Sequence, residues 1–373
     1  MNKARTLVFS QRHIHDALFR CPLYELEDLV CQIDSAEILA PRTGNNFNFH
    51  YQMSKRVAWH LPLRLNPGIP PTELKQEYDL FFAACGSPVD LLIVDTVKNR
   101  MDTCRISVCL LDELWMTEMS KCKHFLKILS DFDFVMPYYS QGVKALSEMT
   151  GCKAVFLPPG IDALRFCPYP DPPQRVIDVY SAGRRSSVTH KKLLATAAER
   201  QMFYLYDTIS GSRAIDTSEH RALFANIAKR SRYFIVNPAL IDRIDIRGDQ
   251  SEIGYRYFEG AASGAIMLGE RPKNRDFDSL FDWPDAVIDL PFGSDRIDTV
   301  IAELDAQPDR QHRIRQTNIV QALRRHDWAY RWDTVLQNVS LPPLPGLIER
   351  KDRLTTFADT LQSVQSRQVV SGA

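Results

Sequence analysis

Two glutamates stand close together in a stretch that otherwise resembles a buried helix. Residues 252–270 read EIGYRYFEGAASGAIMLGE. At helical spacing, with Ser251 as the cap and Glu252 in the first turn, Glu252, Arg256 and Glu259 share one face (i, i+4, i+7). Glu259 is then either a surface carboxylate in a ladder of ion pairs or a carboxylate presented to a ligand. The small residues of GAASGA favour the ligand, because they let a sheet or a bound molecule approach the helix closely.

A second group of candidate residues forms a basic turn after the strand-like run VIDVYSAG. The turn and the start of the next helix contain Gly183, Arg184, Arg185, His190, Lys191 and Lys192. Free N–H groups and the helix dipole favour anions at a helix N-terminus, and one guanidinium group can donate to two phosphate oxygens at once. The turn is therefore either a diphosphate site or a solvated basic surface. The G-x-G-x-x-G motif of the usual dinucleotide site is missing.

Polar side chains also follow strand-like runs in the first half of the chain. After TLVFS come Ser10, Arg12, His13 and His15. The two histidines suggest acid–base or metal chemistry, or they are plain surface residues. Asp112, in CLLDELW, is either a proton-transfer group or the cap of a following helix. No cluster in the sequence has the ligand spacing of a metal site.

Apolar runs and helical patterns alternate along the chain. In the first half the runs fall at 6–10, 90–96, 105–115, 132–140 and 153–162, and in the second half at 176–186, 202–208, 232–239, 265–270 and 285–291. Helical spacing occurs at 22–33, 140–151, 190–201, 219–231 and 310–338. Continuously apolar strands that alternate with helices predict parallel sheets covered on both faces.

A proline-rich linker divides the chain. Residues 167–175 contain four prolines in nine residues, which disfavour both helix and sheet. We therefore predict an α/β chain with domains at 1–168 and 169–340. A last amphipathic helix within 341–373 is expected to pack on the first domain. The aromatic residues of HDWAYRWDTVL, at 326–336, indicate packing between the domains.

The composition of the 373-residue chain is that of an ordinary globular protein, with 45% hydrophobic and 25% charged residues. Its 46 basic and 46 acidic residues cancel, so total charge gives no sign of nucleic-acid binding. The apolar runs are too short to span a membrane, and the N-terminus lacks the apolar region of a secretory signal. Eight cysteines without C-x-x-C spacing fit a reduced chain, so we expect a cytoplasmic protein.

Taken in order, these motifs resemble those of the GT-B glycosyltransferases, in particular the family-4-like retaining group (glycosyl transferases group 1). SEIGYRYFEGAASGAIMLGE is similar to their two-glutamate motif, and VYSAGRRSSVTHKKLL to their donor loop. FDFVMPYYSQGVKALSEMTGCKAVFLPPGIDALRFCP resembles the last βα unit of their first domain. The resemblance implies two Rossmann-like, doubly wound domains facing a central cleft. Two departures are visible: six residues instead of seven separate Glu252 and Glu259, and Leu111 stands where many members have histidine.

The resemblance also implies roles for individual residues. Those expected to bind the nucleotide and ribose of the donor are Glu259, Gly183 and Tyr255. Those expected to bind its diphosphate are Arg184, Arg185 and Lys191, with His190 or Lys192 as substitutes for Lys191. Those expected at the donor sugar are Glu252, Gly254 and Arg256. Asp112 and His13 are the catalytic candidates, and Ser10, Arg12 and His15 the candidates on the acceptor side.

The implied activity is transfer of a hexosyl or pentosyl group from a nucleotide-diphosphate sugar to an acceptor hydroxyl, with retention. No cofactor and no obligatory metal ion is expected. The acceptor is a carbohydrate, a lipid-linked sugar or a small molecule, and peripheral membrane association and the oligomeric state stay open. The two departures leave two alternatives: a non-catalytic GT-B module that binds a nucleotide sugar or a partner protein, and a nucleotide-sugar epimerase.

Overall fold

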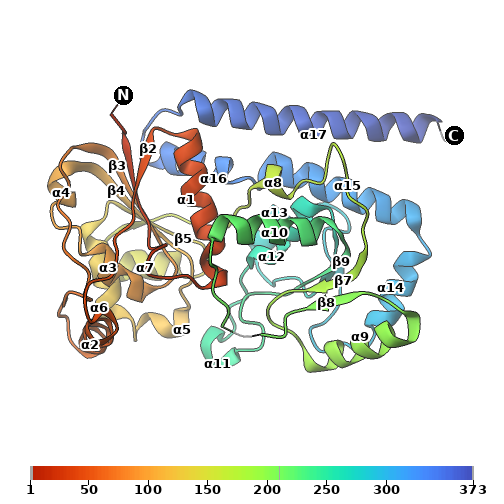
Figure 1. Cartoon of the computed structure of the whole chain (residues 1–373), viewed down its shortest axis with the longest axis horizontal. Helices are drawn as coiled ribbons and strands as arrows, with labels where there is room; N and C mark the ends of the chain where they lie inside the picture. Colours follow the sequence, from red (N-terminus) through yellow and green to blue (C-terminus); the bar gives the residue numbers. More distant parts are fainter. Residues whose placement is uncertain (1–2, 210, 372–373) are drawn as a thin grey trace.

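The computed structural model describes residues 3–209 and 211–371, with side chains as far as residue 363. Two α/β halves lie side by side, and the long helix α17 (Pro345–Ser371) runs along one edge of both (Figure 1). In the described part of the chain no helix is long and apolar enough to cross a membrane. All eight cysteines are free thiols, as their spacing predicted.

The first half is built on a six-stranded parallel sheet in the order β2-β1-β3-β4-β5-β6. Its strands are β1 (Thr6–Phe9), β2 (Ala36–Leu39), β3 (Tyr78–Cys85), β4 (Cys104–Leu111), β5 (Phe134–Pro137) and β6 (Lys153–Ala154). The register places Leu80 beside Ile106 and Val108 beside Phe134. The inner strands are buried on both faces, which explains their continuous apolar sequences.

One predicted strand of this sheet is wrong. The apolar run at 90–96 is a turn of helix, α3 (Leu91–Val94), preceded by the 3-10 turn η2 (Pro88–Asp90). Ser87 and Asp90 form a capping box around this turn, with Pro88 at the first helical position, and this arrangement starts a helix. The strand of this region is β3, twelve residues earlier.

The second half is built on a five-stranded parallel sheet in the order β11-β10-β9-β7-β8. Its strands are β7 (Ile177–Ser181), β8 (Tyr204–Tyr206), β9 (Ser231–Val236), β10 (Ile266–Gly269) and β11 (Ile288–Asp289). Four lie within a predicted apolar run and β9 begins one residue before its run, so the two doubly wound α/β domains are confirmed.

Helices cover both sheets. In the first half they are α1 (Cys21–Ile33), α2 (Phe47–His60), α4 (Arg100–Thr103), α5 (Met116–Met119), α6 (Lys123–Leu126), α7 (Val143–Thr150) and α8 (Ala163–Phe166), with the 3-10 turns η1 (Leu18–Arg20) and η3 (Lys127–Asp131). In the second half they are α9 (Ser187–Arg200), α10 (Thr217–Lys229), α11 (Ile244–Arg247), α12 (Tyr255–Ser263), α13 (Arg275–Leu280), α14 (Ile297–Asp305) and α15 (Pro308–Arg325), whereas α16 (Trp328–Asn338) packs against α1 of the first half.

Helix α12 begins later than predicted. Its N-cap is Gly254, so Ser251 is not the cap and Glu252 is not in the first turn. Residues 251–254 are held away from the helix because the Ala239 N–H donates to the Glu252 carbonyl over 3.0 Å. The common helical face predicted for Glu252, Arg256 and Glu259 is therefore wrong.

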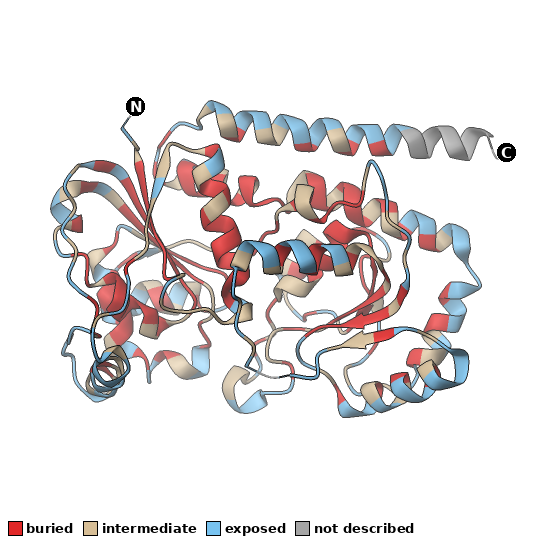
Figure 2. Ribbon diagram, in the orientation of Figure 1, coloured by how far each residue is buried: buried red, intermediate tan, exposed pale blue. Residues whose placement is uncertain are grey.

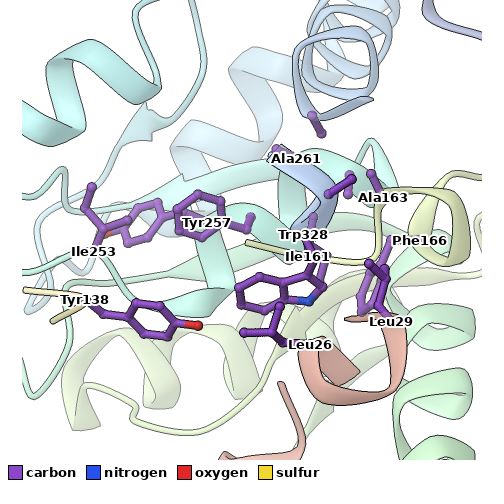
Figure 3. Packing of buried hydrophobic residues seen from close by; sticks show 14 of the residues in the cluster. Leu26, Leu29, Tyr138, Ile161, Ala163, Phe166, Ile253, Tyr257, Ala261 and Trp328 are labelled. Atoms are coloured by element: carbon purple, nitrogen blue, oxygen red, sulfur yellow. The ribbon is translucent and has the colours of Figure 1, made fainter. Parts of the chain in front are cut away.

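The predicted helix 310–338 is two helices, α15 and α16, and the break brings the chain back to the first domain. Asp327 caps α16, and Ile161 forms a parallel bridge with Asp327. Trp328 and Trp332 are wholly buried, and Trp332 donates to Asp34 of the first domain over 2.8 Å. Figure 2 shows buried residues running through the boundary between the halves, and Figure 3 places Trp328 beside Leu26. The predicted packing role of these aromatics is confirmed.

Candidate active site

The carboxyl ends of the two sheets meet at the boundary between the domains. Ser140, after β5, donates a hydrogen bond to Asp276 of α13. The Met116 backbone N–H, after β4, donates to the Gln250 side chain over 3.0 Å. Ligands of open parallel sheets bind beyond the carboxyl ends of the strands, so this boundary is where a site is expected.

Three polar groups from both domains gather at this boundary. Asp112 directly follows β4, and burial raises the pKa of its carboxyl to about 8. Tyr138 follows β5, Tyr255 opens α12, and their ring centroids lie 6.1 Å apart. Burial and then the charge of Asp112 raise the pKa of both tyrosines. Both hydroxyls are buried and lie near one another and near Asp112, but within the described residues neither completes a hydrogen bond of good geometry.

Glu27 of α1 is a further carboxyl near this group, since its charge also raises the pKa of Tyr138. Its Oε2 accepts hydrogen bonds from the Ser10 hydroxyl and, over 3.0 Å, from Arg12. Its Oε1 is buried and has no partner among the described atoms, and burial raises the pKa of Glu27 to about 7. The predicted acceptor-side residues Ser10 and Arg12 thus position Glu27, which sequence reasoning missed inside an ordinary helical pattern.

The two histidines of the first loop occupy different environments. His13 is exposed, and the described part of the chain shows no hydrogen bond or ion pair to it. His15 is half-buried, with Nε2 3.5 Å from the Asp90 carboxylate. Burial lowers the pKa of His15, although the charge of Asp90 opposes this effect. The catalytic role of His13 stays a prediction.

Glu259 is wholly buried, so the surface alternative is wrong. One carboxylate oxygen accepts from Arg221 of α10 and the other from Arg256, each over 2.5 Å. Arg221 also donates to Glu25 of α1 over 2.9 Å. Burial alone would raise the pKa of Glu259, but Arg256 and Arg221 lower it below its usual value. The four side chains form a buried ion network across the domain boundary.

Glu252 lies at the same boundary, before α12. It accepts a hydrogen bond from Gln250 over 2.7 Å, and it lies beside the backbone of Ser140 and Gln141 of the first domain. Burial raises its pKa to about 7. The N-cap of α12, Gly254, supplies no side-chain cap, and no acidic residue stands in the first turn. The free N–H groups of this helix are therefore suited to an anion.

The basic turn lies at the end of β7. Gly183 has a φ of 84°, which favours glycine, and its N–H donates to Asp207 over 2.6 Å. Arg184 is exposed and donates to Asp242 over 2.8 Å. Arg185 lies over the ring of Tyr206, and its Nη1 is buried and lacks a partner among the described atoms.

The three residues proposed as alternatives for the phosphate lysine differ in their partners. Lys191 is exposed, and the described residues give it no ion pair. Lys192 forms an ion pair with Asp298 at 2.9 Å, and His190 Nδ1 lies 2.9 Å from the Tyr204 hydroxyl. Lys191 is therefore the free cation at the start of α9 among these three.

Two hollows adjoin the strand ends of the second sheet. The first is lined by Ser186, Thr189 and His190 of the α9 start together with Asn237 and Gly269. The second, of about 680 Å³, is lined by residues 270–275 with Asp278, Asp289 and Pro291. Its volume falls in the range of small-molecule sites, about 300–1,000 Å³. Across residues 3–209 and 211–371, no group of three or more His, Cys, Asp or Glu is arranged to hold a metal ion.

Residues 184–337 match a family model described as glycosyl transferase-like. A search of curated proteins finds no match. Among solved structures, the chain is similar to Anabaena Alr3699/HepE in complex with UDP-glucose, with a TM-score of 0.53 and 11% identity over 90% of this chain and 99% of that one. It is also similar to an alpha-glucosyltransferase in complex with UDP-glucose and DNA containing an abasic site, with a TM-score of 0.52 and 11% identity over 91% and 100% of the two chains.

Proposed function

We propose that this chain, which has the GT-B fold and a glycosyl transferase-like second half, transfers a sugar from a nucleotide-diphosphate sugar to an acceptor hydroxyl with retention. Two similar structures hold UDP-glucose, which supports a nucleotide sugar as the donor. The donor would lie at the strand ends of the second sheet. Arg185, Lys191 and the free N–H groups of α12 would bind its diphosphate.

The observation that carries this proposal is the meeting of Asp112 with Tyr138 and Tyr255 at the domain boundary. Buried hydroxyls without well-formed hydrogen bonds are costly, and a sugar hydroxyl would satisfy them. Because the Asp112 pKa is about 8, the carboxyl is mostly protonated at neutral pH. It would then donate a hydrogen bond to the bound sugar and would not repel the nearby diphosphate.

In this arrangement Asp112 positions the reacting sugar. With retention, the oxygen of the leaving diphosphate can take the proton of the attacking acceptor hydroxyl. Cations and helix N–H groups at the diphosphate stabilise the charge that develops there as the glycosidic bond breaks. Contact between the domains excludes water, which would otherwise compete with the acceptor.

A donor screen tests the proposal. UDP-, GDP- and ADP-sugars would be incubated with the protein, and release of the nucleoside diphosphate would be measured with the Asp112→Ala and Asp352→Asn variants. We expect turnover of one donor, a loss of about 100-fold in kcat for Asp112→Ala, and no change for the exposed α17 control. NMR of the product gives the anomeric configuration. An inverted product would exclude retention but would leave sugar transfer standing.

A non-catalytic binding module is the second candidate, because Arg221 and Arg256 already occupy both oxygens of Glu259. If the chain is such a module, a nucleotide sugar should raise its thermal unfolding temperature, but no turnover should be measured. Conversion of the donor to its epimer without any acceptor would instead identify an epimerase.

A further inference from the structure

Helix α2 buries unusually little of its surface for its length. Of its 14 residues only Ser54 and Ala58 are buried, both small. Phe49 and Met53, four residues apart and so on one face, are 66% and 43% exposed. An isolated exposed apolar side chain needs no explanation, but a cluster of them marks an interaction surface.

The segment after the helix continues this apolar surface. Leu61, Leu63 and Leu65 are 50%, 52% and 44% exposed. Residues 49–65 thus hold five of the eighteen large apolar side chains that are exposed in the part of the chain with described side chains. A hollow of about 410 Å³ on α2 is lined by Phe49, Met53, Trp59 and their polar neighbours.

The unpaired charge of this surface has one sign. From Ile38 to Thr72 the sequence has no aspartate or glutamate, although the whole chain has as many acidic as basic residues. Lys55 and Arg56 lie on α2 beside the hollow, and the described residues offer them no ion pair. Arg64 does not add to this charge, because Asp131 and Asp95 neutralise it.

Helix α6 extends the basic surface. It packs beside α2, with the Trp59 and Phe125 ring centroids 5.5 Å apart, and the two helices lie together at one edge of the first domain (Figure 1). Lys123 and Lys127, at its start and just past its end, are exposed. The basic apolar surface therefore consists of α2, residues 61–65 and α6.

We propose that this basic apolar surface docks on a lipid bilayer that contains anionic headgroups. Apolar side chains flanked by lysine and arginine bind the bilayer interface by burial and by attraction to negative lipids. A second copy of this chain fits less well, since a two-fold contact of this surface would bring two sets of lysine and arginine side chains together without acidic partners. The surface also adjoins the loop after β1, where the Tyr51 and His15 ring centroids lie 6.1 Å apart.

Vesicle sedimentation of the full chain tests this proposal. Phosphatidylcholine vesicles with and without phosphatidylserine would be compared at low and high salt. We expect the protein to sediment with anionic vesicles at low salt only. Phe49→Ser combined with Met53→Ser, and separately Lys55→Glu combined with Arg56→Glu, should each lower vesicle affinity by at least about tenfold. Phe203→Ser combined with Leu223→Ser, at exposed apolar positions of the second domain, should leave it unchanged.

Two measurements keep the result interpretable. Phe49, Met53 and Arg56 are exposed and Lys55 is half-buried, so circular dichroism should show the same unfolding midpoint for both double variants, and their turnover of a soluble donor should equal that of the wild type. Vesicle binding is measured without any donor, so its outcome does not depend on the proposed transfer activity. Wild-type protein that stays in the supernatant with anionic vesicles would overturn the proposal. So would a dimer in sedimentation velocity that the Phe49 and Met53 changes dissociate, because the occupant would then be a second copy.

Discussion

Replacing Arg221 with methionine should destabilise the protein far more than removing an exposed arginine. Arg221 is 2% exposed and joins Glu25 of the first domain to Glu259 of the second. The Arg221 guanidinium lies over the ring of Phe166; methionine, of similar length, can still pack against this ring, so the change removes mainly charge and hydrogen bonds. Removing one partner of a buried ion pair costs about 3–5 kcal/mol, because a buried charge loses its compensation.

The control is Arg324→Met. Arg324 pairs with Asp359 across an exposed surface, where the side chains are 35% and 59% exposed. Such pairs contribute at most about 1 kcal/mol. Urea unfolding followed by tryptophan fluorescence suits the comparison, because the Trp328 indole donates to Glu25 over 3.0 Å. With an m value of about 3 kcal/mol/M, a loss of about 3–5 kcal/mol lowers the midpoint of Arg221→Met by about 1–1.7 M.

The pH dependence supplies a second check. The folded pKa of Glu259 lies below its usual value in the wild type, so its contribution is present above the unfolded pKa and is lost as pH falls through the folded pKa. In Arg221→Met, protonation of the Glu259 carboxyl removes the negative charge that Arg221 no longer compensates. The difference in stability between variant and wild type should therefore shrink as the pH falls from 7 towards 4. A loss no larger than that of Arg324→Met, or a difference independent of pH, would refute the buried-network explanation.

Two further changes test local features. In Gly269→Ala the new Cβ would lie 1.6 Å from the carbonyl oxygen of Val236, so we expect β10 to separate from β9. Chemical denaturation should show a loss of more than about 3 kcal/mol in the free energy of unfolding. Gly293→Ala, where the new Cβ lies in open space, should leave this free energy unchanged. The folded pKa of Glu252 is raised from 4.5 to about 7, so the folded state keeps a proton that the unfolded chain releases, and stability falls as pH rises between these values. Thermal unfolding of Glu252→Gln should lack this slope; a slope equal to that of the wild type would disprove the assignment.

Most of the architecture follows from local pattern. Buried parallel strands are continuously apolar, and helices show their period, so both sheets and the division near the prolines could be predicted. The strand missed at 78–85 and the helix at 91–94 are both apolar runs of strand length. The capping box of Ser87 and Asp90 makes the second run a helix and not a strand. An analysis of hydrophobic periodicity does not detect such a cap.

The candidate site could be predicted only in part. The basic turn and Asp112 follow strands, so their place at the sheet ends is a consequence of topology. The ion network around Glu259 was not predictable, because Arg221 lies 38 residues from Glu259 in the chain and meets Glu25, which is 196 residues from Arg221. A helical pattern cannot tell a carboxylate in water from one that meets an arginine of another element. The same reason hid Glu27 and Tyr138.

The chain passes between the two halves twice, and the passages lie together. The first follows Ile161 and continues through residues 167–175; the second is the break before Trp328, whose N–H donates to the Ile161 carbonyl over 3.0 Å. Two adjacent chain connections favour a hinge movement of one half relative to the other. They leave rotation about one line as the easiest relative movement and resist twisting and sliding. They also mean that after a single break in the linker the halves would still be held together by the packing of α16 and α17 on the first half, so separation would require these helices to dissociate.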